Sequence, residues 1–184
     1  PGWVNIENGV AAAAIALTYG LDPQEIRKAL ASFSGVKRRF DLQVKTPGIV
    51  YIDDYAHHPM ELEASLKSVN ALYSDKKIVV VFQPHLYTRT RDFYHEFAAA
   101  LSHAEQVVLV EIYPARELPI EGITSQIILD EVTSPVKRLT TKAELIDTLK
   151  TLDFDVLLTV GAGDIDTYIP SIIENEELGI RNEE

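Results

Sequence analysis

Short runs of apolar, mostly β-branched residues alternate along this chain with stretches that repeat at helical spacing. The run Ile78 to Phe82 (Ile-Val-Val-Val-Phe) is the clearest example, and the strand that it predicts over 77–82 is apolar on both faces. Such strands, separated by helices, are typical of a mostly parallel sheet covered on both sides. We therefore expect an α/β fold, an open doubly wound sheet over about residues 42–175.

The remaining elements of this domain follow from the same patterns. Leu62, Leu66 and Val69 recur at spacings of three and four, which predicts a helix over 59–73. Further strands are expected over 42–46, 49–52, 106–112, 136–139 and 155–160, and further helices over 91–103, 124–132, 141–151 and 164–175.

The first 35 residues predict two helices and no strand. An Ala-rich helix is expected over 6–19. The second helix begins after Asp22, its predicted N-cap, with Pro23 in the first helical position and Glu25 completing a capping box.

A basic connector, Lys37 to Arg39, separates the two parts of the chain. We therefore expect a helical unit with its connector over residues 1–40 and the α/β domain over 41–184. Guanidinium groups in a connector can clamp a phosphate when two domains close, although a solvated linker has the same composition.

Charge and composition exclude several classes of protein. The chain has 17 Lys and Arg against 28 Asp and Glu, a net charge of −11, and no cysteine. Nucleic acid is therefore not an expected partner, and a disulfide scaffold or thiolate nucleophile is excluded. No apolar run approaches the roughly 20 residues of a membrane span, so we expect no membrane insertion and a cytoplasmic location.

Polar and charged residues gather where the predicted strands end. Because the carboxyl ends of parallel strands meet at one edge of a sheet, we expect these segments to converge on a crevice that binds an anion or carboxylate. The segments are Asp53-Asp54-Tyr55-Ala56-His57-His58-Pro59, Gln83-Pro84-His85-Leu86-Tyr87-Thr88-Arg89-Thr90-Arg91-Asp92, Tyr113-Pro114-Ala115-Arg116-Glu117 and Gly161-Ala162-Gly163-Asp164.

Each of these residues also has an ordinary structural interpretation. Asp53 or Asp54 could cap the following helix, and Thr88 or Thr90 could cap the next one. Gly161-Ala-Gly163 matches only a fragment of a phosphate loop. Arg116 could be a solvated loop residue, and His95 and His103 have a structural interpretation. A metal site built from Asp53, Asp54, His57, His58 and His85 is chemically allowed, but its spacing matches no metal signature.

Taken together, the motifs resemble the C-terminal part of the Mur ligases, and among them the members that attach L-alanine to UDP-N-acetylmuramic acid. The pieces Phe82-Gln-Pro-His85 and Thr88-Arg-Thr-Arg-Asp92 distinguish these members from those that add later residues. Asn5-Ile-Glu-Asn8 and Gly35-Val-Lys-Arg-Arg-Phe-Asp41 resemble the end of the family's central ATPase domain and its hinge, so the resemblance spans nearly the whole chain.

The resemblance implies a Rossmann-like domain in an ATP-dependent, ADP-forming ligase of peptidoglycan synthesis. In this reaction ATP converts the carboxylate of UDP-N-acetylmuramic acid to an acyl phosphate, which the amine of L-alanine attacks. Mg²⁺ would be held mainly by the central domain. The implied ATP-binding residues are Asn5, Asn8, Arg39, Asp54 and Tyr55, and the implied substrate-binding residues are His57, His85 and Arg89.

Two positions depart from the family pattern. Val4 stands where the family usually has histidine, and Leu86 where arginine is common.

The 184 residues also contain no phosphate loop of the form Gly-x-x-Gly-Lys-Thr/Ser. We therefore expect no catalytic residue in this part and no ligase activity from the chain alone. A metal-dependent phosphoesterase and a non-catalytic nucleotide-binding module stay open as alternatives.

Overall fold

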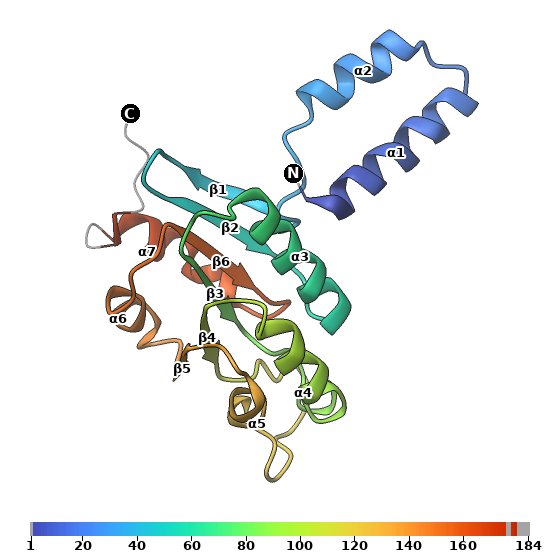
Figure 1. The fold of residues 1–184 in the computed structure, drawn as a ribbon. Helices are drawn as coiled ribbons and strands as arrows, with labels where there is room; N and C mark the ends of the chain where they lie inside the picture. Colours follow the sequence, from blue (N-terminus) through green and yellow to red (C-terminus); the bar gives the residue numbers. More distant parts are fainter. Residues whose placement is uncertain (1, 176–177, 180–184) are drawn as a thin grey trace.

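The computed structural model describes residues 2–175, 178 and 179, and within them six strands form one sheet (Figure 1). The strand order is β1-β2-β6-β3-β4-β5; β1 is antiparallel to β2, and the other neighbours are parallel. This confirms the predicted α/β fold. The strands are β1 (Asp41–Lys45), β2 (Val50–Asp54), β3 (Ile78–Phe82), β4 (Gln106–Val110), β5 (Val136–Thr140) and β6 (Val156–Val160).

Helices cover both faces of the sheet, as expected for a doubly wound domain. One face is covered by α3 (Pro59–Leu72), α4 (Tyr87–Leu101) and α5 (Ser125–Glu131). The other is covered by α6 (Leu145–Lys150), the 3₁₀ helix η1 (Ile165–Tyr168) and α7 (Ile169–Glu174).

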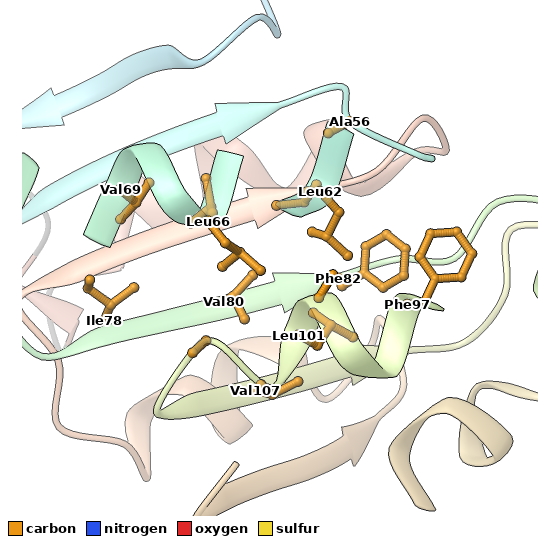
Figure 2. Packing of buried hydrophobic residues seen from close by; sticks show 14 of the residues in the cluster. Ala56, Leu62, Leu66, Val69, Ile78, Val80, Phe82, Phe97, Leu101 and Val107 are labelled. Carbon is orange, nitrogen blue, oxygen red and sulfur yellow. The ribbon is translucent and has the colours of Figure 1, made fainter. Parts of the chain in front are cut away.

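Alternation along the strands divides the core into two layers. Val80 and Phe82 of β3 pack against Leu66 of α3 and Phe97 of α4 (Figure 2), whereas Val81 faces the opposite cluster. The rings of Phe82 and Phe97 lie 5.1 Å apart. Burying such a side chain contributes about 1.5–3 kcal/mol, so the central strands are held from both sides.

The first two helices, α1 (Trp3–Thr18) and α2 (Pro23–Ser32), project away from the sheet (Figure 1). Asp22 caps α2 as predicted, but its side chain accepts from the backbone N–H of Gln24, at the second helical position, over 2.8 Å. Their aromatic residues are exposed, with 66% of Trp3 and 85% of Tyr19 accessible. The apolar composition of this unit therefore does not form a core within the described residues.

The helix predicted over 91–103 is wrong at its start, because α4 begins at Tyr87. The backbone departs from helical geometry at Phe93 (φ −130°, ψ 15°), so a first turn precedes the amphipathic segment. The predicted helix began at Arg91, so periodicity found the amphipathic segment and missed the residues from Tyr87 to Thr90. The helix predicted over 164–175 divides into η1 and α7, and β4 ends two residues earlier than expected.

Candidate functional site

The loops that leave β2, β6, β3 and β4 lie side by side at one edge of the sheet. The N–H of Gly161 donates to the carbonyl of Asp54 over 3.1 Å, and His85 pairs with Tyr113 in a short parallel bridge. These backbone contacts extend the sheet beyond its strands. They bring together the polar segments that the sequence placed at the strand ends.

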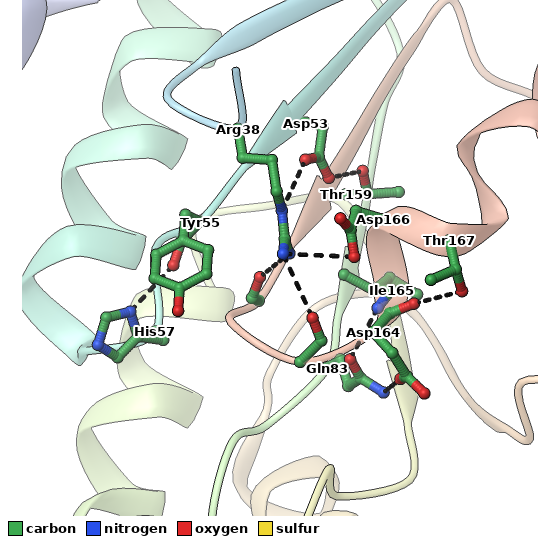
Figure 3. Close-up of polar contacts among 12 residues, drawn as sticks. Arg38, Asp53, Tyr55, His57, Gln83, Thr159, Asp164, Ile165, Asp166 and Thr167 are labelled. Atoms are coloured by element: carbon green, nitrogen blue, oxygen red, sulfur yellow. Dashed lines mark hydrogen bonds and ion pairs between the residues drawn. The ribbon is translucent and has the colours of Figure 1, made fainter. Parts of the chain in front are cut away.

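Arg38 occupies the centre of this edge, although it belongs to the connector (Figure 3). Its Nη2 donates to the carbonyl of Gly161 over 2.6 Å, and Nη1 to that of Gly163 over 3.3 Å. The same Nη1 lies 3.3 Å from a carboxylate oxygen of Asp166, and the guanidinium carbon lies 4.9 Å from the ring centroid of Tyr55. With 16% of its side chain exposed, Arg38 joins the β2 and β6 loops.

Asp53 is the buried counter-charge of Arg38. Its Oδ2 lies 3.4 Å from Nε of Arg38, and its Oδ1 accepts from the hydroxyl of Thr159 over 2.7 Å. Nε and Oδ2 have no hydrogen-bond partner among the described residues, so their attraction is Coulombic. Burial raises the pKa of Asp53 to about 6, although the Thr159 bond and the Arg38 charge act to lower it.

Asp54 points to the opposite face of the sheet. Its carboxylate accepts from the hydroxyl of Ser65. Burial is the main cause that raises the pKa of Asp54, and the nearby backbone N–H groups of Phe40 and Ala56 act to lower it. The carboxylate therefore serves contacts within the domain, and the nucleoside contact suggested for Asp54 stays a prediction.

Neither aspartate caps α3, so that structural interpretation was wrong. The cap position is His58, and Oε2 of Glu61 accepts from the N–H groups of His57 and His58 over 2.9 and 3.1 Å. Asp53 and Asp54 are instead the last residues of β2. The strand runs two residues further than its apolar pattern predicted, because both carboxylates find buried partners.

Gly161 and Gly163 are required by close packing around Gln83. A Cβ on Gly161 would lie 2.7 Å from the carbonyl oxygen of Gln83, and one on Gly163 would lie 2.6 Å from Cβ of Tyr113. Both glycines direct carbonyl oxygens at Arg38, whereas a phosphate loop directs N–H groups at its anion. In this structure the glycine pair therefore holds an arginine.

Half-buried rings form a continuous row along the same edge. Ring centroids are 5.3 Å apart for Tyr55 and His57, 6.3 Å for His57 and His85, and 5.7 Å for His85 and Tyr113, which are stacked. Nη1 of Arg89 lies 3.4 Å from Nδ1 of His85. The structure thus brings His57, His85 and Arg89 together beside Tyr55.

The pKa of His85 is lowered, first by burial and then by the charges of Arg89 and His57. At neutral pH its imidazole is therefore uncharged, and the adjacent guanidinium carries the positive charge. This pairing suits a carboxylate ligand with a neutral hydrogen-bonding group beside it.

Arg39, the next residue after Arg38, faces outward. Its guanidinium carbon lies 5.6 Å from the ring centroid of Tyr55, and its side chain is exposed. The ring of Tyr55 therefore has the largely buried guanidinium of Arg38 and the exposed guanidinium of Arg39 beside it. Only the exposed one is open to an anion from solvent.

Glu117 holds the first turn of α4. Its carboxylate accepts from the N–H of Thr88 over 3.0 Å and from its hydroxyl over 2.5 Å. Leu86 occupies the cap position, with φ +74°, and the hydroxyl of Thr90 donates to its carbonyl over 2.9 Å. The interpretation of Thr88 or Thr90 as caps was therefore wrong.

The other basic residues of these segments lie outside the row of rings. Arg91 is exposed and pairs with Asp92 over 2.7 Å, and His95 is exposed and pairs with Glu131 over 2.6 Å. Arg116 is an exposed loop residue, as its structural interpretation held.

Asn5 and Asn8 lie on α1, where Asn5 is half-buried and Asn8 exposed. The first turn of α1 contacts α3 through the N–H of Trp3 and the hydroxyl of Ser68, 3.4 Å apart. The structure does not bring these asparagines into the row of rings, so their role stays a prediction. The side chain of Val4 lies outside what the structure describes.

A cleft of about 540 Å³ lies next to the row of rings, at the carboxyl ends of β4 and β5. Tyr87, Pro114, Thr140 and Lys142 are among the residues that line it. Lys142 donates to Asp164 over 2.7 Å, so its charge is already neutralised at the wall of the cleft.

Sequence reasoning missed the inward position of Arg38 and the contact of Glu117. The basic run Lys37 to Arg39 was a signal for the first, but nothing in it distinguishes the inward arginine from the outward one. Glu117 reaches Thr88 across 29 positions, and no local pattern reports such a contact.

The described residues contain no cluster of three or more His, Asp or Glu side chains that could hold a metal ion, and no helix among them is long and apolar enough to cross a membrane. The five residues weighed as metal ligands have other partners, since Asp53 and Asp54 point to opposite faces and His58 packs against Phe93 at 5.1 Å.

Comparison with known proteins gives consistent matches. The UDP-N-acetylmuramate–L-alanine ligase of Phocaeicola vulgatus is 54% identical over 173 residues, which are 94% of this chain and 38% of the relative. The ligase of the same name from Flavobacterium johnsoniae is 51% identical over 172 residues, 94% of this chain and 38% of the relative. The chain thus spans about 38% of the length of these relatives.

Solved structures give the same likeness. The UDP-N-acetylmuramate–alanine ligase of Thermotoga maritima is 32% identical with a TM-score of 0.75, over 94% of this chain and 37% of that one. MurF from Acinetobacter baumannii is 19% identical with a TM-score of 0.69, over 95% of this chain and 38% of that one, and shows the shared fold. The family described as "Mur ligase, glutamate ligase domain" matches residues 38–163, more than half of the chain. This chain, with its six-stranded sheet and the polar edge built around Arg38, therefore belongs to the Mur ligase family.

Proposed function

We propose that this chain is the C-terminal, amino-acid-receiving part of an ATP-dependent, ADP-forming ligase that joins L-alanine to UDP-N-acetylmuramic acid. The observation that carries this proposal is the grouping of His57, His85 and Arg89 on one edge of the sheet, beside Tyr55. These are the residues for which the family resemblance implies substrate binding. The names of relatives that are more than 50% identical support the same reaction.

The described residues supply half of such a site. Relatives of this chain are more than twice as long, and the α1–α2 unit exposes Trp3, Tyr19 and Phe33. Side chains of this size are usually covered in a folded protein. We propose that the rest of the ligase covers this unit and supplies the phosphate loop.

The chemistry assigned to this half is binding and orientation. The guanidinium of Arg89 pairs with a carboxylate, and the neutral imidazole of His85 accepts or donates a hydrogen bond next to it. Arg39 reaches the phosphates of ATP from the outer side of Tyr55, whose ring meets the nucleoside together with Asp54, while Asn5 and Asn8 bind the adenine. Holding acyl phosphate and amine together lowers the entropic cost of their reaction.

Mg²⁺ is the metal implied for this reaction, where it neutralises phosphate charge. The two carboxylates at the end of β2 are engaged within the domain, Asp53 by Arg38 and Thr159 and Asp54 by Ser65. They do not form a donor set for a metal ion. We propose that the remainder of the ligase binds Mg²⁺, and that the enzyme is cytoplasmic, where its nucleotide substrates are found.

The test is ADP formation with UDP-N-acetylmuramic acid, L-alanine and ATP. The 184-residue chain is expected to be inactive. A chimera in which it replaces the corresponding segment of the Phocaeicola vulgatus ligase is expected to be active. Arg89→Met in the chimera should raise the KM of one carboxylate substrate about tenfold or more, which corresponds to roughly 1.4 kcal/mol.

The opposite results would reject the proposal. An inactive but folded chimera argues against the ligase assignment. If nucleotide stabilises that chimera with no dependence on L-alanine, the chain is a nucleotide-binding module instead. Ligase activity of the 184-residue chain alone would refute the proposal that the rest of the ligase supplies part of the active site.

A further inference from the structure

We propose that Arg38 is a positioning residue that locks the connector onto the α/β domain and thereby holds Arg39 and Tyr55 where the nucleotide binds. The role of Arg39 and Tyr55 toward the nucleotide rests on the function proposed above. The locking itself follows from contacts within the described residues.

The backbone of the connector is held in an unusual conformation. Arg38 has φ +60° and Phe40 has φ +50°, both in the left-handed region that residues other than glycine rarely adopt. The N–H of Arg38 donates to Oδ2 of Asp41 over 3.0 Å, and its carbonyl accepts from the N–H of Tyr55 over 2.7 Å. Such a turn persists only where surrounding contacts compensate its strain.

The side chain of Arg38 supplies those contacts. Nη2 is bonded to the carbonyl of Gly161, Nη1 contacts Gly163 and Asp166, and Nε faces Asp53. Both terminal nitrogens of the guanidinium thus have hydrogen-bond partners inside the domain, and Nε lies beside the Asp53 carboxylate without a hydrogen bond. The fork is therefore engaged within the domain, which distinguishes Arg38 from a ligand-binding arginine.

The inward position of Arg38 determines the outward position of Arg39. Consecutive side chains of this turn flank the ring of Tyr55, at 4.9 Å for Arg38 and 5.6 Å for Arg39. The N–H of Arg39 also bonds to the carbonyl of Val36 over 3.0 Å, which closes the turn. Arg39 is therefore fixed relative to the strand ends although its own guanidinium is exposed.

This arrangement also locates the hinge between the helical unit and the α/β domain. Gly35 has φ +101° and nothing within 4 Å of the place of a Cβ, and it precedes the anchored turn. Rotation of α1 and α2 against the sheet would therefore occur at or before Gly35. Arg39 would then move with the α/β domain rather than with the helical unit.

A double-mutant cycle in the active chimera tests the proposal. We expect Arg39→Met to raise the KM for ATP about tenfold in the otherwise unchanged protein, but only about twofold or less in the Arg38→Met background. Arg38→Lys keeps the charge beside Asp53 but lacks the two terminal guanidinium nitrogens. Its KM for ATP should therefore lie between the values of the unchanged protein and Arg38→Met. If the two effects multiply independently, Arg38 does not act through Arg39 and the proposal is overturned.

A second measurement tests the locking without catalysis. Hydrogen exchange of the Tyr55 amide in the 184-residue chain should accelerate about tenfold or more in Arg38→Met, and less in Arg38→Lys. An unchanged exchange rate overturns the proposal whatever the kinetics show. Arg138→Met removes the same charge from an exposed position on β5 and should change neither readout.

The two proposals fail in different ways. If Arg39→Met alone leaves the KM for ATP unchanged, the nucleotide role of Arg39 is wrong. The hydrogen exchange of the Tyr55 amide still decides whether Arg38 locks the connector onto the α/β domain. If Arg38→Met does not fold, the same cycle and exchange measurement with Arg38→Lys decide: additive kinetics or an unchanged Tyr55 amide count against the inference.

Discussion

The hydroxyl of Thr159 donates to the carboxylate of Asp53 across 2.7 Å inside the sheet, between two residues 106 positions apart. Burial nevertheless raises the pKa of Asp53 to about 6, from 3.8 for an exposed aspartate. The folded chain therefore binds a proton between these pH values that the unfolded chain has released. The contribution of Asp53 to stability is largest below about pH 4 and declines as the pH rises to 6.

Asp53→Asn should remove this decline. A pKa difference of about 2 units corresponds to roughly 3 kcal/mol, so the difference in unfolding free energy between wild type and variant should fall by about 2–3 kcal/mol from pH 4 to pH 7. Urea denaturation across this range gives the measurement, and the exposed Asp130→Asn is its control. Parallel curves for wild type and Asp53→Asn would show that Asp53 does not titrate in this window.

The backbone at Gly163 is packed so closely that there is no space for a side chain. A Cβ there would contact Oε1 of Gln83 and Cβ of Tyr113, so Gly163→Ala should lower the unfolding free energy by about 2 kcal/mol or more. Gly48→Ala is the matched control, because nothing lies within 4 Å of its Cβ position. It should change stability by less than about 1 kcal/mol. Equal effects at the two sites would contradict the packing role of Gly163.

The sequence predicted the core of this fold because periodicity reports burial directly. The strand expected over 77–82 is β3, which begins one residue later at Ile78, and Leu62, Leu66 and Val69 lie fully buried on one face of α3. These elements depend on local pattern and on burial from both sides. Their prediction needed no knowledge of the strand order.

The candidate site could be predicted only in part. Parallel strands bring their carboxyl ends to one edge, so the convergence of His57, His85 and Arg89 follows from the fold class. The directions of Arg38 and Asp54 do not follow from it. The direction of Arg38 depends on a left-handed turn and on a hydrogen bond to Gly161, which is distant in sequence. The direction of Asp54 depends on a buried hydrogen bond to Ser65 of α3.

Arg89 lies 3.4 Å from Nδ1 of His85, and its charge is one of the causes that lower the pKa of His85. Arg89→Met removes this charge, so the protonated imidazole becomes less unfavourable and the pKa of His85 should rise. An NMR titration of the His85 ring protons gives the measurement. Arg91→Met removes an exposed arginine that pairs with Asp92 and should leave the titration midpoint unchanged. A fall in the midpoint for Arg89→Met would contradict the assigned electrostatics.

Glu117 acts on His85 with the opposite sign. Its carboxylate holds Thr88 through two hydrogen bonds, and its charge raises the pKa of His85. Glu117→Gln has nearly the same shape without the charge. We expect a lower titration midpoint for His85 and faster hydrogen exchange at the Thr88 amide, because a neutral amide is a weaker acceptor than a carboxylate.

The control for Glu117 is Glu121→Gln, an exposed glutamate that follows in the same loop. It should alter neither the His85 titration nor the Thr88 amide. If Glu117→Gln shifts the titration but leaves the amide protected, Glu117 acts only through its charge. If it accelerates exchange of the Thr88 amide without shifting the His85 titration, Glu117 acts only by holding the first turn of α4. Both effects together support a single carboxylate that holds the first turn of α4 and sets the charge state beside Arg89.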